Sequence, residues 1–579
     1  MNWLLKPKAP KEFIGQFPEY SPMVLQLLYS RGLKTQKEID EFFNPDYKED
    51  LHDPFLMLGV KEAVKRILKA VKKQEKITIF GDYDADGVCG ALILKSTLEA
   101  LGACLGEVQI PDRINDGYGL NSTAIKKIAK ENTKLIVTVD CGITDVAEVK
   151  LANSLKMEVI IVDHHQLGKK LPSAKVIIDP FQKGDKYPFK TLAGAGVAFK
   201  LVQALIKEGG QKIKEGFEKW LLDLVALATV ADCVPLIGEN RTLVRYGLIV
   251  LAQTQRIGLQ ELMKIARLDP VFEAETMTTN LNSYALGFML APRLNAAGRI
   301  KHANLAFRLL ESQEREKARE LAQEIDNFNR QRQKITDDIV AQVEERIKSY
   351  INDPNYPIII EGDQNWSAGI VGLVAGKISD KYQRPTIILN HENGLSRGSA
   401  RSLPAFNIIE ALKDSAEFLK DFGGHPVAAG LSLKKENLPL FREKINQFAR
   451  AKIKPEDLAP VLEIETEIAP KNINWELFDN LVKFEPFGNG NRDPVFMIKD
   501  LEIVNSRLVG NGSKHLKLEL KGGNPNNKIF KAIGFRLAKN GNENLKAGDK
   551  VDLAFELIVD EWNGNRDLQL RIIDIKQSL

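Results

Sequence analysis

KITIFGDYDADGVCG, residues Lys76–Gly90, joins a predicted strand to a predicted helix through a loop crowded with carboxylates. The apolar run Ile77–Phe80 predicts the strand, and the spacing of the apolar residues after the loop predicts the helix. The loop carries Asp82, Asp84 and Asp86, which would repel one another at neutral pH unless a cation lies among them or some are protonated. A divalent metal is the simplest cation to expect, because hard ions bind carboxylate oxygens. A polar turn capped by aspartates is the alternative.

Predicted strands and helices alternate from about residue 56 to about residue 235. This alternation is typical of a doubly wound parallel sheet, in which the functional site lies beyond the carboxyl ends of the strands. After Ile77–Phe80, the further predicted strands are Val108–Ile110, Leu135–Val139, Val159–Val162 and Val176–Ile178.

Acidic and imidazole groups follow three of these strands. The loop at Asp82 follows the first, Asp140 follows another, and the run Asp163-His164-His165 follows a third. We therefore expect them to meet at one edge of the sheet. A fourth group, Asp232, ends an apolar helix, where a carboxylate opposes the helix dipole and invites a cation. For Asp232 alone, an exposed aspartate in a turn is an equally good interpretation.

Taken together, these groups form a donor set dominated by carboxylates. It is too large for one catalytic zinc ion, which usually takes three protein ligands rich in His or Cys. It suits two hard ions, Mn²⁺ or Mg²⁺, which can hold a bridging hydroxide, polarise a phosphoryl oxygen and stabilise a leaving oxygen. The set predicts hydrolysis of a phosphoester or phosphoanhydride and consists of Asp82, Asp84, Asp86, Asp140, Asp163, His164, His165 and Asp232.

Composition narrows the class of protein. The 579 residues predict roughly four domains, and 44% hydrophobic with 27% charged residues is ordinary for a globular protein. The net charge of +4 does not predict a polyanion binder over the whole surface. The four cysteines form no CxxC, which favours reduced thiols in the cytoplasm. We expect no signal peptide, no membrane span and no P-loop motor, since the sequence has none of their patterns.

The pattern changes along the chain divide it into five parts. Residues 1–55 predict a small helical cap on the first domain, and residues 56–310 hold the α/β domain with the acidic groups. Residues 311–350 have almost no Gly or Pro and predict one or two long helices that bridge domains. Residues 351–455 begin a second α/β domain, and residues 456–579 alternate as short strands that suit an OB-fold.

Several motifs resemble those of known phosphoesterases. Four of them resemble the motifs of the DHH phosphoesterase superfamily, namely DYDADG at 82–87, VDCG at 139–142, VDHH at 162–165 and VADCVPL at 230–236. Longer segments, over essentially the whole chain, are similar to the RecJ family, namely PDRINDGYGLN at 111–121, LAPRLNAAGRI at 290–300, GSARS at 398–402, FGGHPVAAGLSL at 422–433 and EPFGNGNRDPVF at 485–496.

The resemblance implies a fold and an activity. The fold would be a DHH-type doubly wound parallel sheet, a long connecting helix, a DHHA1 α/β domain and a C-terminal OB-like β-barrel. The activity would be that of a single-stranded-DNA-specific 5′→3′ exonuclease, which hydrolyses phosphodiester bonds with two Mn²⁺ or Mg²⁺ ions and releases 5′-mononucleotides in DNA repair and recombination. The implied partners are single-stranded DNA, a single-strand-binding protein and a RecQ-type helicase. We expect a cytoplasmic monomer.

The resemblance also implies roles for the acidic groups. Asp82 and Asp84 would hold one ion, and the second would be held by Asp86, His164 and Asp232. Asp140 would bridge both ions. His165 would face the scissile phosphate, and Asp163 would orient the imidazoles, with a helix cap as the alternative role for Asp163.

Predicted DNA contacts lie in loops rich in small residues, where a backbone can approach a phosphate. In the α/β domain they are Arg113, Tyr118, Arg293, Asn295 and Arg299, with Tyr118 stacking on a base or simply packing. Ser399, Arg401 and His425 would hold the nucleotide from across a cleft. Asn329–Arg332 is a further candidate for DNA contact, although a solvated helix face is the safer expectation. The C-terminal candidates could equally be ordinary surface or core, and they are Lys514, His515, Lys517, Phe535, Trp562 and Arg566.

Two other functions fit parts of the sequence. A small-substrate phosphatase or oligonucleotidase of the same superfamily would not need the OB-like C-terminus. A non-catalytic DNA-binding relative would not need to retain every type of metal ligand. Activity on long DNA chains would argue against the small-substrate enzyme. DNA binding without detectable hydrolysis in manganese would support the non-catalytic relative.

Overall fold

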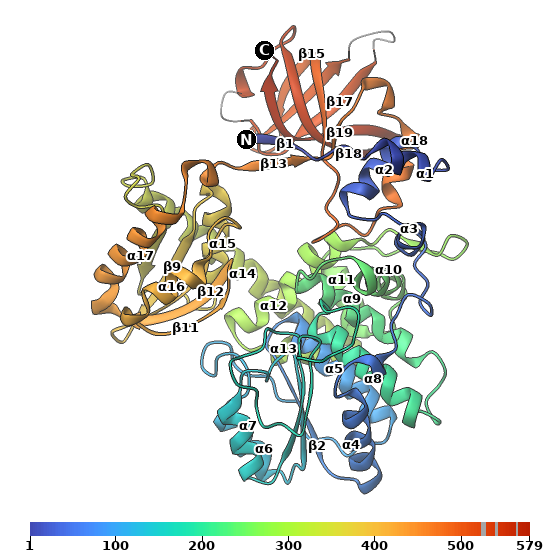
Figure 1. The fold of residues 1–579 in the computed structure, drawn as a ribbon, viewed down its shortest axis with the longest axis vertical. Helices are drawn as coiled ribbons and strands as arrows, with labels where there is room; N and C mark the ends of the chain where they lie inside the picture. Colours follow the sequence, from blue (N-terminus) through green and yellow to red (C-terminus); the bar gives the residue numbers. More distant parts are fainter. Residues whose placement is uncertain (523–527, 539–541, 563–564, 579) are drawn as a thin grey trace. The chain divides into compact units, whose positions relative to one another are not determined.

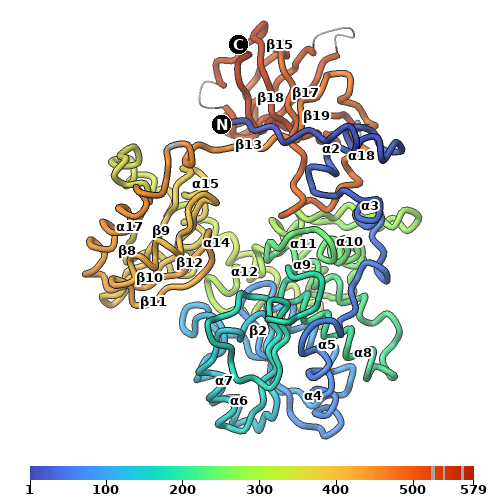
Figure 2. Tube along the Cα trace, viewed as in Figure 1, coloured from blue at the N-terminus to red at the C-terminus, as the bar shows by residue number. Residues whose placement is uncertain are grey.

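The computed structural model describes residues 1–522, 528–538, 542–562 and 565–578. The chain, coloured along its sequence in Figure 1 and Figure 2, forms two compact units. We call them the α/β unit and the barrel unit. The α/β unit comprises Tyr47–Val234 and Glu239–Ala459, and the barrel unit comprises Met1–Asp46, Pro235–Gly238 and Pro460–Leu579.

The first sheet of the α/β unit is parallel and doubly wound, as predicted. Its strands follow the order β2 (Ile77–Gly81), β3 (Leu135–Val139), β4 (Glu158–Val162) and β5 (Val176–Ile178). On the other edge of β2, Leu105 and Gln109 form isolated parallel bridges to Ile77 and Phe80. The chain therefore turns first to one side of β2 and then to the other, which creates a topological switch point at this strand. The strand predicted at 108–110 amounts only to these bridges.

Helices cover both faces of this sheet. On one face, α6 (Ser122–Lys130) and α7 (Val146–Ser154) place Ile125 and Val149 against Phe80, Ile136 and Ile161. The other face carries α5 (Ala85–Ala100), which crosses β3 closely, because a Cβ at Gly90 would lie 2.5 Å from Val139. Helices α8 (Gly194–Gly209) and α9 (Leu222–Ala231) pack against α5, and α4 (Val60–Lys73) packs against α8.

One continuous helix connects the two sheets of the α/β unit. This is α14 (Arg315–Ile347), 33 residues long, which confirms the prediction of a long helix. Its last turns pack Ile339, Val343 and Ile347 against the second sheet and its helix α15 (Val371–Tyr382). The PRLNAAGR segment, predicted as a loop, lies instead in α12 (Ala291–Ile300), because its Ala and Leu residues favour a helix more than its one glycine opposes it.

The second sheet has the order β11-β12-β10-β9-β8 and is antiparallel except for β8 with β9. Helices α16 (Ile408–Asp414) and α17 (Leu438–Lys452) cover one face, and α14 with α15 covers the other at β8 and β9. GSARS and GGH, predicted as a loop and a turn, belong to strands. The strands are β8 (Ile359–Asp363), β9 (Thr386–Glu392), β10 (Leu395–Arg401), β11 (Leu419–His425) and β12 (Ala428–Lys434).

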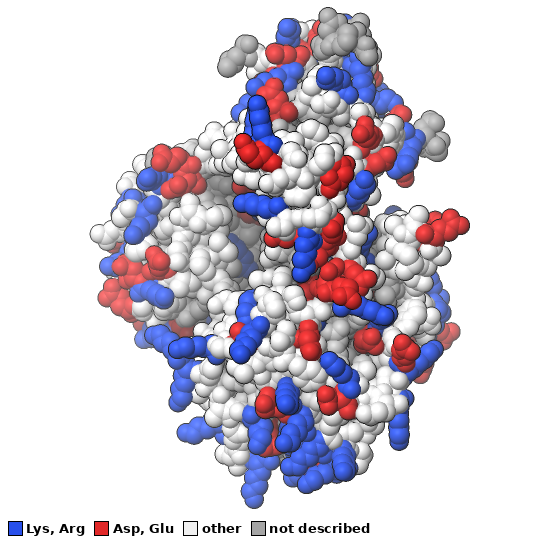
Figure 3. Space-filling view, turned by 45° about the vertical axis from the view of Figure 1, so that its right-hand side comes forward, with Lys and Arg blue, Asp and Glu red and all other residues white. Residues whose placement is uncertain are grey.

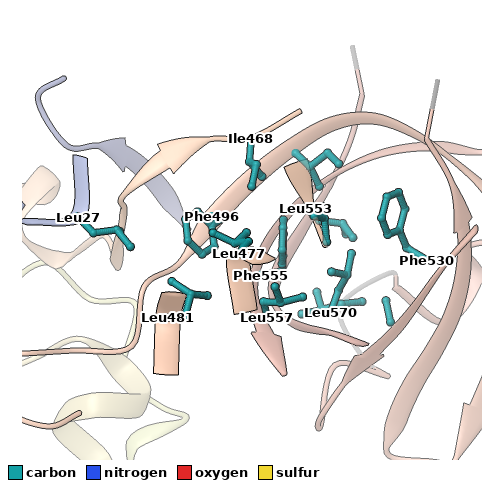
Figure 4. Close-up of a cluster of buried hydrophobic side chains, with 14 of the residues drawn as sticks. Leu27, Ile468, Leu477, Leu481, Phe496, Phe530, Leu553, Phe555, Leu557 and Leu570 are labelled. Atoms are coloured by element: carbon teal, nitrogen blue, oxygen red, sulfur yellow. The ribbon is translucent and has the colours of Figure 1, made fainter. Parts of the chain in front are cut away.

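A closed barrel forms the second unit, as the OB-like prediction implied. Strand β15 pairs with β16 on one side and β18 on the other, and β17 and β19 complete the circle. Its interior side chains belong to the apolar cluster of Figure 4, which also includes Leu27 of α2 and Leu477 and Leu481 of α18 (Trp475–Val482). The barrel strands are β15 (Phe496–Val509), β16 (His515–Lys521), β17 (Ile529–Gly534), β18 (Lys550–Trp562) and β19 (Asn565–Gln577).

The N-terminal segment, for which the sequence predicts a cap on the first domain, belongs to the barrel unit as far as Asp46. Its first strand, β1 (Asn2–Leu5), pairs in parallel with β13 (Val461–Ile464). Helices α2 (Pro22–Ser30) and α3 (Gln36–Phe43) contribute Leu27 and Phe42 to the barrel core. These pairings join residues more than 400 apart in sequence, so no local pattern predicts them.

Charge is mixed over the surface. On the face drawn in Figure 3, lysines and arginines lie among aspartates and glutamates, in keeping with the small net charge of +4. Among the described residues, no helix is both long and apolar enough to cross a lipid bilayer.

Candidate metal centre and strand-binding surface

The carboxyl ends of three neighbouring strands and the end of one helix place the predicted acidic groups together. Asp82 follows β2, Asp140 follows β3, Asp163 follows β4, and Asp232 caps α9. The structure brings potential ligand atoms within 4.8 Å of one another in three groups. These groups are Asp82 with Asp84 and Asp140, Asp86 with His164 and Asp232, and Asp140 with His164 and His165.

Two helix N-termini hold the loop that follows β2. Asp84 caps α5, and its Oδ1 accepts hydrogen bonds from the backbone N–H groups of Asp86 and Gly87, at 3.0 and 3.2 Å. The two oxygens of Asp86 accept from Gly194 N and Ala195 N at the start of α8, at 2.6 and 2.7 Å. The charge of Asp86 therefore lies where a helix dipole favours an anion.

Asp140 and Asp232 complete the acidic cluster around His164. Asp140 adopts a left-handed φ of 61°, a conformation that aspartate tolerates better than most residues. Its Oδ1 lies 3.1 Å from His164 Nε2, and Asp232 Oδ2 lies 3.7 Å from the same nitrogen. Gly194 is needed beside Asp140, because an added Cβ would come within 2.7 Å of the Asp140 Cβ. Asp232 therefore faces the cluster and is not a turn residue directed at solvent.

The electrostatics of the cluster favour a bound cation. Burial and the charge of Asp84 raise the pKa of Asp82 well above its usual range, and burial with the charge of Asp86 does the same for Asp140 and Asp232. Asp82 Oδ1 is buried without a hydrogen-bond partner. Several carboxylates, one or two imidazoles and a vacant buried oxygen fit hard divalent ions better than zinc. The donor set thus fits Mn²⁺ or Mg²⁺.

His165 is held by a carboxylate and a phenol. Its Nδ1 lies 2.8 Å from Asp163 Oδ1 and 3.0 Å from the hydroxyl of Tyr118. Burial lowers the pKa of His165, but the hydrogen bond and charge of Asp163 outweigh burial and raise it to about 9. For His164, burial and the charge of His165 lower the pKa to about 4. The pKa values of the two adjacent imidazoles are therefore shifted in opposite directions.

The side chains of Asp163 and Tyr118 form hydrogen bonds to the backbone around the acidic cluster, and these bonds indicate a positioning role. Asp163 accepts hydrogen bonds from Ile143 N and His164 N, at 3.0 and 2.8 Å, besides its contact with His165. The Tyr118 hydroxyl donates to the carbonyl oxygen of Asp140 at 2.9 Å. Tyr118 thus ties the loop after residue 111 to the acidic cluster, a role that its predicted stacking or packing did not include.

A group of arginines lies next to the loop that carries Asp82, Asp84 and Asp86, which we call the metal loop. Arg113 covers the ring of Tyr83 at 4.1 Å, and Arg299 donates to the carbonyl oxygen of Gly369 at 3.1 Å. Burial and the charges of Arg113 and Arg332 lower the pKa of Arg299 to about 9. The Nε atoms of Arg113 and Arg332 are buried without a partner. This arginine cluster (Arg113, Arg299, Arg332 and Arg401) has the charge and free donors to bind a phosphate.

Arg332 lies in this cluster although the sequence favoured a solvated helix face for it. Because α14 is a single helix with polar residues on several sides, the sequence gives no signal for which side faces the site. Burial lowers the pKa of Arg332, which agrees with a partly enclosed position.

The predicted contacts of the second sheet share one open face. Arg401 of β10 and His425 of β11 both lie opposite Ala428 of the intervening β12, so they point to the same side. Ser399, two residues before Arg401, is on this side too, and Arg401 Nη1 donates to its Oγ at 2.8 Å. A cavity of about 570 Å³ lies between this face and the first domain, lined in part by Arg113, Arg397, Ser399, Phe422 and Ser432.

Arg293 and Asn295 are placed differently from the prediction of DNA contacts. Arg293 Nε donates to Asp326 Oδ1 of α14 at 2.9 Å, so its charge is used in a largely buried ion pair. Asn295 Oδ1 accepts from Ala85 N of the metal loop at 2.8 Å. Both side chains therefore support the position of α12, and contact of either with DNA stays a prediction.

The candidate contacts of the barrel unit are dispersed. His515 and the exposed Phe535 form an edge-to-face pair with ring centroids 5.4 Å apart. Arg566 covers the ring of Trp475 at 5.0 Å. Lys514 precedes β16, and Lys517 lies within it opposite Arg507 of β15. The side chain of Trp562 lies outside the described residues.

Family models match three parts of the chain. They are the N-terminal domain of the DHH family at residues 76–229, the DHHA1 domain at 355–451 and the RecJ OB domain at 464–574.

Relatives extend the match to nearly the whole chain. A single-stranded-DNA-specific exonuclease RecJ of Bacillus subtilis is 39% identical over 96% of this chain and 68% of its own. The RecJ of Haemophilus influenzae is 31% identical over 96% and 97% of the two chains. The crystal structure of Thermus thermophilus RecJ with Mn²⁺ matches all of this chain and 80% of its own, with a TM-score of 0.83 at 27% identity. The same protein with Mg²⁺ matches all of this chain and 79% of its own, with a TM-score of 0.78 at 26% identity.

Proposed function

This chain belongs to the RecJ family of single-stranded-DNA-specific exonucleases, and from that membership we propose that it degrades single-stranded DNA from the 5′ end and releases 5′-mononucleotides. The observation that carries the proposal is the meeting of the acidic cluster with the arginine cluster beside one cavity. The first has the donors for two hard cations, and the second has the charge for a phosphate.

Six side chains would hold two ions. Asp82 and Asp84 would bind one ion and Asp86, His164 and Asp232 the other, with Asp140 shared between them. Two such ions supply an activated water and stabilise the charge that develops on the attacking and leaving oxygens. The helix N-termini that hold Asp84 and Asp86 keep these carboxylates in place before the substrate arrives.

His165 would contact the scissile phosphate. Because its Nδ1 is engaged by Asp163 and Tyr118, its Nε2 is the nitrogen left for a phosphate oxygen. Asp163 favours the imidazolium form, which can donate a hydrogen bond to an oxygen that gains negative charge. Asp163 and Tyr118 are thus positioning residues, and His165 is the catalytic one.

The 5′ polarity would come from the arginine cluster and the second sheet. A 5′-phosphate carries more charge than an internal one. Arg113 lines the cavity, and its charge lowers the pKa of the nearby Arg299 and Arg401. Ser399 adds a hydroxyl next to Arg401. An end bound here would place the first phosphodiester bond at the ions.

We also infer the setting in which the enzyme works. An enzyme of this kind needs unpaired strands, so a RecQ-type helicase and a single-strand-binding protein would supply its substrate. The cysteines are free thiols, which fits the reducing cytoplasm. We expect the protein to act as a monomer.

Digestion of a long single-stranded DNA labelled at either end tests the proposal. In Mn²⁺, the wild type should release labelled mononucleotides early from the 5′ label only, and Asp140→Ala should release none. Release from the 3′ label would contradict the polarity. Hydrolysis of di- or trinucleotides without digestion of long DNA would indicate a small-substrate phosphoesterase, and DNA binding without hydrolysis would indicate a non-catalytic relative.

A further inference from the structure

An exposed aromatic pair lies at the start of the helix whose Asn295 accepts a hydrogen bond from the metal loop. Tyr284 and Phe288 are 61% and 71% exposed, and their rings stack with centroids 4.9 Å apart and planes at 20°. Among the described residues, Phe288 is the most exposed large apolar side chain. Two parallel rings held in solvent are a surface that another flat, apolar group can cover.

The backbone beneath the pair is a π-helix. It spans Ala285–Leu290 and continues directly into α12. π-helical turns are rare and occur mostly at functional sites. Its buried residues Ala285, Leu286 and Leu290 attach the turn to the unit. The turn therefore presents both rings on its outer side and fixes their direction.

Two structural connections link the aromatic pair to the metal centre, one through α9 and one through α12. Between the two rings, Gly287 packs on α9, where an added Cβ would lie 3.2 Å from Val230 and two residues before Asp232. Farther along the same helix, Asn295 holds the metal loop and Arg299 belongs to the arginine cluster. One rigid helix thus carries the rings, a support of the metal loop and a phosphate-binding charge.

We propose that Tyr284 and Phe288 form a stacking platform for the bases of the DNA strand next to the metal centre. This inference rests on the proposed function and adds to it a group that recognises bases. Every base has a π-face, so stacking on the platform would tolerate any sequence, as an exonuclease that proceeds along a strand requires. The phosphates would meanwhile be read by the neighbouring arginines.

The test measures steady-state hydrolysis of single-stranded oligonucleotides by the full chain in Mn²⁺. Phe288→Ala should raise KM about 5- to 150-fold, the range that base stacking predicts, with kcat unchanged. Phe288→Leu keeps the apolar bulk without a flat ring and should behave like Phe288→Ala, whereas Phe288→Trp should retain the wild-type KM. Trp220→Ala is the matched control, since Trp220 is 46% exposed in the same unit but precedes α9 at its far end, and KM should not change.

An abasic site moved along the oligonucleotide gives a readout that a structural role would not affect. In the wild type, one position should show the same rise in KM as Phe288→Ala, and in Phe288→Ala that position should show no further rise. Hydrolysis of a dinucleotide, too short to reach the platform, should be equal in all variants.

Two experimental results would refute the proposed stacking platform. One is an unchanged KM in Phe288→Ala, and the other is an abasic penalty that persists in full in that variant. If the wild type degrades no long DNA, the proposed exonuclease fails, but fluorescence anisotropy with the same oligonucleotides still tests the platform. Equal affinities of wild type and Phe288→Ala, or no binding by either, would then overturn it.

Discussion

Replacing Asp86 by asparagine should stabilise the metal-free protein above neutral pH while weakening its response to metal. Burial and the charge of Asp84 raise the pKa of Asp86 to about 7, from 3.8 for an ordinary aspartate. Between these pH values the carboxyl is protonated in the folded chain and ionised in the unfolded one. The stability from this raised pKa is fully present below pH 3.8 and is lost as the pH rises through about 7.

The expected change in stability on replacing Asp86 follows from the raised pKa and from the hydrogen bonds that Asp86 accepts. A pKa difference of about 3 corresponds to about 4 kcal/mol of destabilisation once Asp86 is ionised. Asparagine removes this charge, but its NH₂ group must then face one of the two backbone N–H donors, Gly194 N or Ala195 N. That mismatch costs about 1–3 kcal/mol. The net gain at pH 8 is about 1–3 kcal/mol, or roughly 1–4 °C in Tm for a unit of this size.

Thermal unfolding in EDTA and in Mn²⁺, at pH 5 and pH 8, measures both effects. In EDTA, Asp86→Asn should melt above the wild type at pH 8, and its advantage should shrink at pH 5, where Asp86 is protonated in the folded wild type. Mn²⁺ should raise the Tm of the wild type at pH 8 more than that of the variant, which keeps only the site formed by Asp82, Asp84 and Asp140. A variant that melts below the wild type at pH 8 in EDTA, or gains as much from Mn²⁺, would refute the reasoning.

Three further changes test other parts of the site. Asp163→Asn should lower kcat about 100-fold or more with little change in KM, because His165 loses the charge that orients it, and stopped-flow hydrolysis measures this. Arg401→Ala should abolish any preference for a 5′-phosphate over a 5′-hydroxyl end, and equal preference in variant and wild type would count against a 5′-phosphate site. Arg293→Met should lower the free energy of unfolding by about 1–3 kcal/mol because it leaves Asp326 buried with less compensation, and Arg293→Met combined with Asp326→Leu should recover most of it in urea denaturation.

The acidic cluster could be predicted from sequence because its signal is local. Asp82, Asp140 and Asp163 each follow a short apolar run, and parallel strands bring their carboxyl ends to one edge whatever the rest of the chain does. Asp232 was open to two interpretations, since its position depends on how α9 packs on the sheet. The fold class followed from the same alternation of strands and helices.

What the sequence missed depends on packing between distant segments. Arg332 and Arg293 both lie on helices, and only the crossing of α12 with α14 decides that one faces the arginine cluster and the other an ion pair. The small residues of PRLNAAGR predict a loop, but a helix accepts them too. The N-terminal segment joins the barrel through a strand pairing across more than 400 residues, for which the local pattern gives no signal.

The central claim is that two hard ions bind at the strand ends through separate ligand sets that share Asp140. Equilibrium dialysis with Mn²⁺, read by electron paramagnetic resonance, tests it most directly. We predict two ions per chain in the wild type with the spectrum of a coupled pair. Asp82→Ala and Asp232→Ala should each retain one uncoupled ion, and Asp140→Ala should lose the coupling and weaken both sites. One ion in the wild type, or two in every variant, would contradict the account.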